Sequence, residues 1–245
     1  MASHSELERP AFYALRPGGW RDLLTLLHPP YTAWHLSYVA IGAAVAPTFS
    51  GNRLVWTLVA FLLAVGVAAH ALDELHGRPL GTRISSRTLV CLAIFALAGA
   101  SAIGVIGAAT ISWWLLAFVV VGVVLSVAYN LELLGGRLHS DLWFALAWGA
   151  FPALTSYWAQ SGSMRPQGLL VAGGCFFLSV AQRHLSTPVR ELRRRTASLS
   201  GERLTNDGRA LPLSASTIAA PIESALMACS AGMVLLAAGL VIARL

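Results

Sequence analysis

Long apolar runs, separated by short polar segments, dominate the sequence. A helix that crosses a bilayer needs about 20 mostly apolar residues. We predict a membrane-spanning helix in each of seven apolar runs: Tyr31–Phe49, Leu54–Leu72, Thr88–Ala108, Ile111–Tyr129, Leu142–Trp158, Pro166–Ala181 and Ala219–Ala243. The pattern therefore predicts an all-α, polytopic transmembrane helical bundle of about seven spans, forming a single integral-membrane domain over residues 1–245.

Two longer polar segments flank the predicted spans. Residues 1–30 are expected to form a cytosolic and interfacial N-terminal segment, in which Trp20–Leu27 is typical of a short helix lying on the membrane. Residues 182–217 are the longest polar segment, which we interpret as a cytosolic loop. The simplest interpretation of the triplet Arg193-Arg194-Arg195 within it is an anchor that contacts anionic lipid headgroups.

The composition agrees with a membrane protein. The chain is 56% hydrophobic and 11% charged, whereas an ordinary soluble domain carries about 25% charged residues. So much apolar surface excludes a soluble globular enzyme, a disordered chain and a nucleic-acid-binding domain, despite the formal net charge of +6.

All 17 basic residues are Arg, and their distribution predicts an orientation. When the N-terminus is placed inside, 14 of the 17 fall in inner segments, and only Arg53, Arg165 and Arg244 fall outside. Cytoplasmic loops are enriched in basic residues. We therefore predict an integral membrane protein with a cytosolic N-terminus, in a bacterial or archaeal plasma membrane.

The richest polar cluster closes the second predicted span. On a helix, His70, Asp73, Glu74 and Gly77 share one face through i+3 and i+4 spacing. Two carboxylates and an imidazole on one stripe can hold a divalent cation or accept a proton. We predict that these three side chains carry the chemistry, with Asp73 and Glu74 as metal ligands. A charged helix end that reaches the headgroups is the structural alternative.

A second, basic cluster closes the sixth predicted span. Because the chain has no Lys, a phosphate group must be bound by Arg, backbone N–H groups or metal. Arg183, His184 and Arg190 are candidates for binding a diphosphate directly. Tyr129 and Arg137, which follow the fourth span, are predicted to face the same chamber. The alternatives for these two are an aromatic-belt Tyr and a topology-setting Arg.

The order and positions of the predicted spans and polar clusters resemble those of the UbiA superfamily of intramembrane prenyltransferases. The opening His28-Pro29-Pro30-Tyr31-Thr32 is similar to that family's first helix, and Tyr129-Asn130 resembles its Tyr-Ser/Thr-Pro step after helix four. Residues 70–83 and 182–195 stand where the family carries its two Asp-rich motifs. The resemblance covers roughly residues 24–200.

This resemblance implies a fold and a reaction. In the family, two Asp-rich cytosolic loops bind Mg²⁺, which holds the diphosphate of an isoprenoid donor, and an acceptor in the membrane chamber captures the allylic cation. The family's first motif reads Asn-Asp-x-x-Asp-x-x-x-Asp, and this chain keeps only Asp73 of its acids. The second motif region contains Glu191 as its sole acid.

Three functions follow from the sequence. We expect a UbiA-like prenyltransferase or related enzyme that acts on a prenyl diphosphate or another isoprenoid lipid at the cytosolic face. Mg²⁺ is the cofactor that the resemblance implies. Because both Asp-rich motifs are incomplete in this chain, either the chemistry has changed or been lost, or the anionic head group is bound by arginines: Arg78, Arg83, Arg183 and Arg190. The alternatives are a non-catalytic lipid-binding or assembly protein with the same fold, and a metal enzyme built on His70, Asp73 and Glu74.

Overall fold

The computed structural model describes residues 9–245, which form a bundle of helices with one small hairpin. The chain is mostly helical (70%). In chain order the elements are α1 (Trp20–Leu26), α2 (Pro29–Ala44), α3 (Gly51–Phe61), η2 (Leu62–Ala69), α4 (His70–Leu75), α5 (Ser86–Thr110), α6 (Leu115–Asn130), α7 (Asp141–Phe144), η3 (Ala145–Ala150), α8 (Phe151–Ser161), α9 (Pro166–Arg194), β1 (Ser200–Leu204), β2 (Ala210–Ser214) and α10 (Ala215–Ile242).

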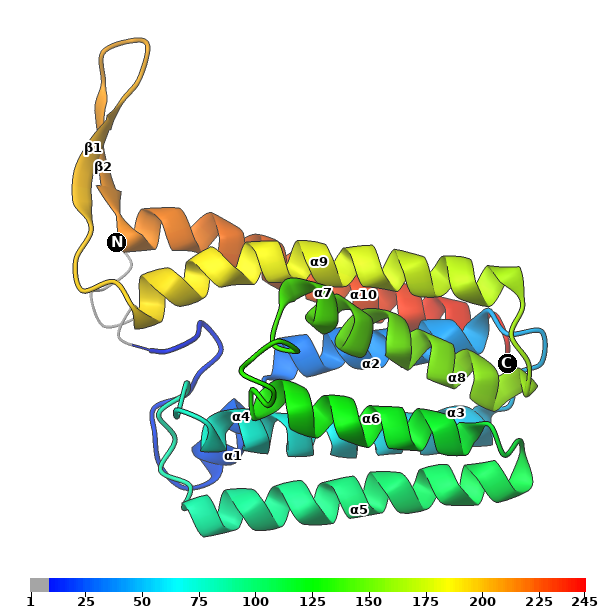
Figure 1. Cartoon of the computed structure of the whole chain (residues 1–245). Helices are drawn as coiled ribbons and strands as arrows, with labels where there is room; N and C mark the ends of the chain where they lie inside the picture. Colours follow the sequence, from blue (N-terminus) through cyan, green and yellow to red (C-terminus); the bar gives the residue numbers. More distant parts are fainter. Residues whose placement is uncertain (1–8) are drawn as a thin grey trace.

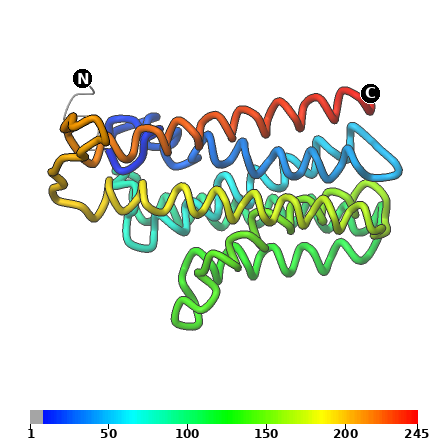
Figure 2. The backbone as a smooth tube through the Cα atoms, turned by 90° about the horizontal axis from the view of Figure 1, so that it is seen from above, coloured from blue at the N-terminus to red at the C-terminus, as the bar shows by residue number. Residues whose placement is uncertain are grey.

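The long helices lie side by side along one direction, as Figures 1 and 2 show from two sides. Each of the seven predicted apolar runs contains a helical segment. Four helices are long and apolar enough to cross a membrane: Gly51–Leu75, Ser86–Thr110, Pro166–Arg194 and Ala215–Ile242. The protein is therefore an integral membrane protein, while seven crossings, the cytosolic N-terminus and the cellular membrane stay predictions.

Two helices contain a π-helical segment, in which the backbone widens locally. Segment η2 joins α3 to α4, so that residues 51–75 form one continuous helix, and η3 joins α7 to α8 over residues 141–161. Short π-helical segments inside α-helices are frequent at functional sites. Here they flank the cavities described below.

Helix α2 packs at the centre of the bundle. Its side chains Trp34 and Tyr38 are fully buried against α8, α9 and α10, where Leu226 is fully buried as well. Gly42 lets α2 approach α8 closely, since a Cβ atom built on it would lie 2.3 Å from the Ala153 carbonyl oxygen. Small residues at such crossings are typical of membrane helices.

Helix α5 lies at the edge of the bundle (Figure 1) and keeps much of its apolar surface exposed. Phe95 and Ile106 are 75% and 64% exposed. Water would oppose this arrangement, whereas lipid tails solvate such side chains readily. This face of the bundle is therefore suited to contact with the bilayer.

The structure corrects the predicted loop over residues 182–217. Helix α9 continues to Arg194, beyond the continuation toward His184 that the sequence allowed, and strands β1 and β2 form an antiparallel hairpin before α10. An ion pair between Arg193 on α9 and Glu223 on α10 holds the helix extension. In it, Arg193 Nη2 donates a hydrogen bond of 2.9 Å to Glu223 Oε2. The chain is thus consistent with the predicted all-α bundle and adds one short hairpin to it.

The N-terminal segment also has defined structure. Residues 1–8 of the predicted 1–30 segment lie outside the described residues. The predicted short helix is confirmed as α1, and Asp22 anchors it because its carboxylate accepts hydrogen bonds from the backbone N–H groups of Gly18 (2.9 Å) and Arg83 (3.0 Å). Its position on a membrane surface stays a prediction.

Candidate functional site

A polar cavity of about 640 Å³ lies at the end of the bundle where α4, the end of α6 and the second half of α9 meet the N-terminal segment. The acidic and basic clusters found in the sequence therefore face the same space. Of the predicted site residues, five line the cavity: His70, Asp73, Tyr129, Arg183 and Arg190.

The two neighbouring acids of α4 have different surroundings. Asp73 lines the cavity, whereas Glu74 is fully buried and points to the loop after α4. The backbone N–H groups of Leu80 (2.9 Å) and Thr82 (2.8 Å) and the Thr82 hydroxyl (2.9 Å) donate to the Glu74 carboxylate. The predicted shared stripe is thus wrong for Glu74, because successive helical positions diverge by about 100°.

Arginine side chains from α9 give the cavity positive charge. Arg190 donates a hydrogen bond to the Thr187 hydroxyl (3.0 Å) and forms no ion pair with a described residue. Arg183 instead pairs with Asp141 on α7 (2.8 Å) and lies over the Phe144 ring. A partly buried Arg without an acidic partner is suited to an anionic ligand.

Histidine and tyrosine side chains form a further part of the cavity lining. The His28 and His70 rings stack with centroids 4.1 Å apart, and His28 Nδ1 shares a hydrogen bond of 2.7 Å with the Tyr13 hydroxyl. Burial, with smaller contributions from His70 and the nearby arginines, holds the pKa of His28 well below its usual range. Burial likewise raises the pKa of Tyr13. Both groups are therefore neutral at ordinary pH.

Three buried polar atoms of the cavity lining lack a hydrogen-bond partner among the described residues; one is Gln182 Oε1, and the other two belong to a histidine and a tyrosine. These two are His28 Nε2 and the Tyr129 hydroxyl. Buried polar atoms are rarely left unpaired in folded proteins. Both residues line the cavity, so a bound polar ligand is the simplest group to satisfy these atoms.

The N-terminal segment covers one side of the cavity. Residues 10–13 line it, and two arginines of α9 hold this stretch in place. Arg193 donates to the Arg9 carbonyl (3.3 Å), and Arg194 donates to the Pro10 carbonyl (3.0 Å). Part of the Arg193-Arg194-Arg195 triplet therefore fixes the wall of the cavity, a role that the lipid-anchor interpretation did not include.

Four predicted head-group residues lie outside the cavity lining. They are Arg78, Arg83, Arg137 and His184. Arg78 donates to the Ile84 carbonyl (2.6 Å) and the Ser86 hydroxyl (2.8 Å), and thereby shapes the loop after α4. The other three residues are exposed. We predicted these residues because they are close in sequence to the acidic and basic clusters. Which side chains reach the cavity depends instead on the direction in which each helical position points.

The sequence interpretation missed several lining residues. They come from the N-terminal segment, α2 and the segments around α6: Tyr13, His28, Tyr31, His35, His76, Asn130, Glu132 and His139. A cluster of His in a chain with so few polar residues was an available signal. Nothing in the hydrophobic pattern of the sequence indicated that the N-terminal segment places Tyr13 in the cavity lining.

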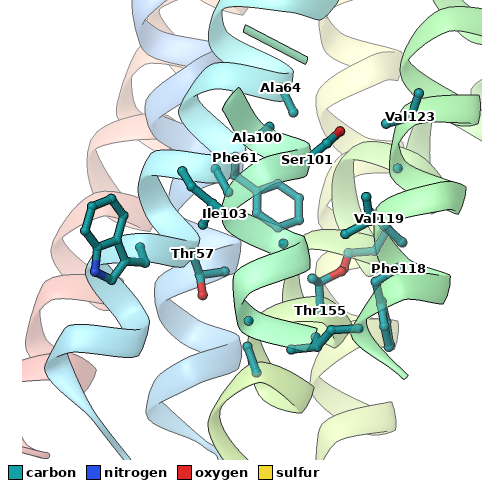
Figure 3. Close-up of a pocket in the computed structure, with 18 of the residues that line it drawn as sticks. Thr57, Phe61, Ala64, Ala100, Ser101, Ile103, Phe118, Val119, Val123 and Thr155 are labelled. Atoms are coloured by element: carbon teal, nitrogen blue, oxygen red, sulfur yellow. The ribbon is translucent and has the colours of Figure 1, made fainter. Parts of the chain in front are cut away.

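An apolar cavity of about 610 Å³ lies beside the polar one, between α3, α5, α6 and α8. Figure 3 shows its wall, with Phe61, Val119 and Phe118 around the space. Val65 of η2 and Trp148 of η3 line both cavities and belong to one core cluster. The two π-helical segments therefore stand at the boundary between a polar and an apolar chamber.

The polar cavity offers one carboxylate of α4, that of Asp73, to the Mg²⁺ that the resemblance implies. Over residues 9–245, no three His, Cys, Asp or Glu side chains are arranged to hold a metal ion. Glu74 has its carboxylate occupied by backbone donors, which leaves Asp73 without the second acid expected from its own helix. Mg²⁺ is usually bound through one or two carboxylates together with waters and substrate phosphates, so its binding to this chain stays a prediction.

Comparisons with protein-family models, curated proteins and solved structures find no match to this chain. The resemblance to the UbiA superfamily therefore remains a prediction from the sequence.

Proposed function

We propose that this protein is an integral-membrane, UbiA-like prenyltransferase that acts on a prenyl diphosphate or a related isoprenoid lipid. The observation that carries the proposal is the pair of adjoining cavities. One is polar and carries Arg190, which has no acidic partner among residues 9–245, and the other is apolar and shares Val65 and Trp148 with it. A molecule with an anionic head and a hydrocarbon tail matches both.

Arg190 and Arg183 are the residues that would hold the head group. A guanidinium presents several N–H donors in a fixed plane, which suits phosphate oxygens. The Tyr129 hydroxyl and His28 Nε2, both buried and unpaired, supply further contacts. The arginines here take the part that metal ions play in the family that the chain resembles.

The apolar cavity would hold the isoprenoid tail. Its lining is made largely of aliphatic and aromatic side chains from helices that also face the bilayer. About 25 cal/mol is gained for each Å² of apolar surface removed from water. The tail therefore supplies affinity, while the head group fixes the position of the reacting bond.

The chemistry follows from the residues at the junction. The bond between the allylic carbon and the diphosphate oxygen breaks, and its electron pair stays on the oxygen beside Arg190. Aromatic rings that line the polar cavity, including Tyr129, Phe144 and Trp148, stabilise the allylic cation through their faces. The acceptor then bonds to the allylic carbon, and the Asp73 carboxylate takes the proton that the acceptor loses.

The test is the release of diphosphate by the purified protein in nanodiscs, with geranyl, farnesyl and geranylgeranyl diphosphate, each with and without Mg²⁺. We expect release that falls at least about 100-fold in Arg190→Ala and in Asp73→Asn. Arg87→Ala is the matched control, since Arg87 is exposed at the start of α5 and lies outside both cavities.

Two results would contradict this function. No release with any chain length, together with tight retention of the prenyl diphosphate, would favour the non-catalytic lipid-binding protein. Stoichiometric transition metal in the purified protein, lost in Asp73→Asn, would favour the metal enzyme.

A further inference from the structure

The β1–β2 hairpin leaves the bundle sideways. Figure 1 shows it roughly perpendicular to the helix axes, and Figure 2 shows it nearly end-on. Strand β2 ends at Ser214 and α10, a candidate membrane-spanning helix, begins at Ala215. A hairpin perpendicular to helices that cross a bilayer runs parallel to the membrane surface, and this one lies beside the ends of α9 and α10 (Figure 1).

The strand register gives the two faces of the hairpin different chemistry. Directly paired residues lie on the same face of an antiparallel ladder. One face therefore carries the pairs Arg203–Leu211 and Gly201–Leu213, and Thr205 beside Arg209 at its tip. The other face carries the pairs Glu202–Pro212, Leu204–Ala210 and Ser200–Ser214. We call the first the arginine face and the second the glutamate face.

The arginine face has the chemistry of an interfacial anchor. It combines two cations with the leucine side chains Leu211 and Leu213. Arg209 is paired with Asp207 (2.7 Å), whereas Arg203 forms no ion pair with a described residue. Long arginine side chains can place their charge among headgroups while their stems and nearby apolar residues lie deeper.

The hairpin has few packing partners within the bundle, so a surface beside the bundle would stabilise it. A lone two-stranded hairpin is marginally stable in water, and nearly all of this one is exposed. Its base is fixed, since Ser214 and Thr217 form a reciprocal capping box at the start of α10. The rest of the hairpin extends past the helices, so a flat partner beside the bundle is geometrically favoured.

We propose that the arginine face docks on the anionic lipid headgroups of the bilayer that the helices cross. Charge complementarity selects anionic lipid, because this face carries Arg203, which has no acidic partner among the described residues, and the opposite face carries Glu202. The orientation selects a bilayer, because the hairpin lies along its surface. The proposal does not depend on prenyl transfer and would hold for a protein with another activity.

Spin labels on neighbouring positions test the proposal. Leu211→Cys and Ala210→Cys place a label at the same depth along β2 on opposite faces, in a chain whose Cys91, Cys175 and Cys229 are replaced. In nanodiscs with about 30% phosphatidylglycerol, we expect the Leu211 label to be accessible to oxygen and shielded from a water-soluble nickel chelate. The Ala210 label should show the reverse.

Removing either the charge or the anionic lipid should release the hairpin. In pure phosphatidylcholine, and in Arg203→Glu combined with Arg209→Glu, the two labels should become equally accessible to the nickel chelate. Equal accessibility of both labels in the anionic nanodiscs would overturn the proposal. Shielding of both labels from oxygen and nickel alike would also overturn it, since that result indicates a second protein copy on the hairpin.

Trypsin cleavage of the unmodified chain provides a test without variants. Arg203 and Arg209 are exposed sites in the hairpin. We expect cleavage there to be about tenfold slower in anionic nanodiscs than in zwitterionic ones. Cleavage at Arg87, which is exposed at the start of α5, normalises the rate. Equal normalised rates in both lipids would overturn docking even if the cysteine-free chain folds poorly.

Discussion

At the scale of single residues, Asp73 and Glu74 show how adjacent acids acquire different tasks. One faces the cavity, and the other closes a loop by accepting three hydrogen bonds from Leu80 and Thr82. The sequence placed both at a helix end beside His70. It could not distinguish them, because a difference of one position decides which side of a helix a residue occupies.

Replacing Glu74 should therefore damage stability. In Glu74→Ala, two backbone N–H groups and one hydroxyl lose their acceptor, at about 1–3 kcal/mol for each buried donor left unpaired. We expect the apparent melting temperature in detergent to fall by at least about 5 °C. Asp73→Asn, the matched neighbour, should melt within about 2 °C of the natural chain. An equal fall in melting temperature in the two variants would contradict the structural role assigned to Glu74 alone.

His28 should make stability depend on pH. Its pKa is depressed in the folded protein because burial disfavours the charged ring, and the nearby His70, Arg194 and Arg190 add to this effect. The unfolded chain takes up a proton near pH 6.5 while folded His28 does not. Stability conferred by neutral His28 is thus present above about pH 6.5 and is lost as the pH falls.

The measurement is the apparent melting temperature at about pH 7.5 and about pH 5.5. We expect the loss on acidification to be smaller in His28→Gln than in the natural chain. His184→Gln, which changes an exposed His of α9, should keep the full loss. A His28→Gln variant with an unchanged pH dependence would refute the assignment.

At the scale of elements, the apolar runs predicted the positions of the helices well. A helix that crosses a bilayer needs about 20 consecutive, mostly apolar residues, and such a run is easily recognised in a sequence. The extension of α9 to Arg194 was less legible, since its last turns are polar and depend on the Arg193–Glu223 pair with α10. The hairpin was missed because its ten paired residues carry little alternation.

Close helix packing yields a prediction at this scale. Gly42→Ala places a methyl group 2.3 Å from the Ala153 carbonyl oxygen, so α2 and α8 must separate. We expect a loss of about 1–3 kcal/mol, typical of overpacking, observed as a lower melting temperature. Gly173→Ala on α9 meets no atom within 4 Å and should melt at the same temperature or higher.

At the scale of the whole molecule, the site brings together segments that are distant in sequence. The acid of α4 and the arginines of α9 were each visible in the sequence as helix-end clusters. Their meeting in one cavity, and the closing of that cavity by Tyr13 and His28, depend on how the helices pack. The adjoining apolar chamber depends on packing as well, since no local pattern separates a cavity wall from a core.

The central claim is that Arg190 holds the anionic head of an isoprenoid lipid. Equilibrium binding of radiolabelled geranylgeranyl diphosphate to the protein in nanodiscs, measured with and without Mg²⁺, tests it most directly. The account predicts saturable binding without Mg²⁺ that weakens at least about tenfold in Arg190→Ala and is unchanged in Arg87→Ala. Equal affinity in Arg190→Ala and the natural chain would contradict it.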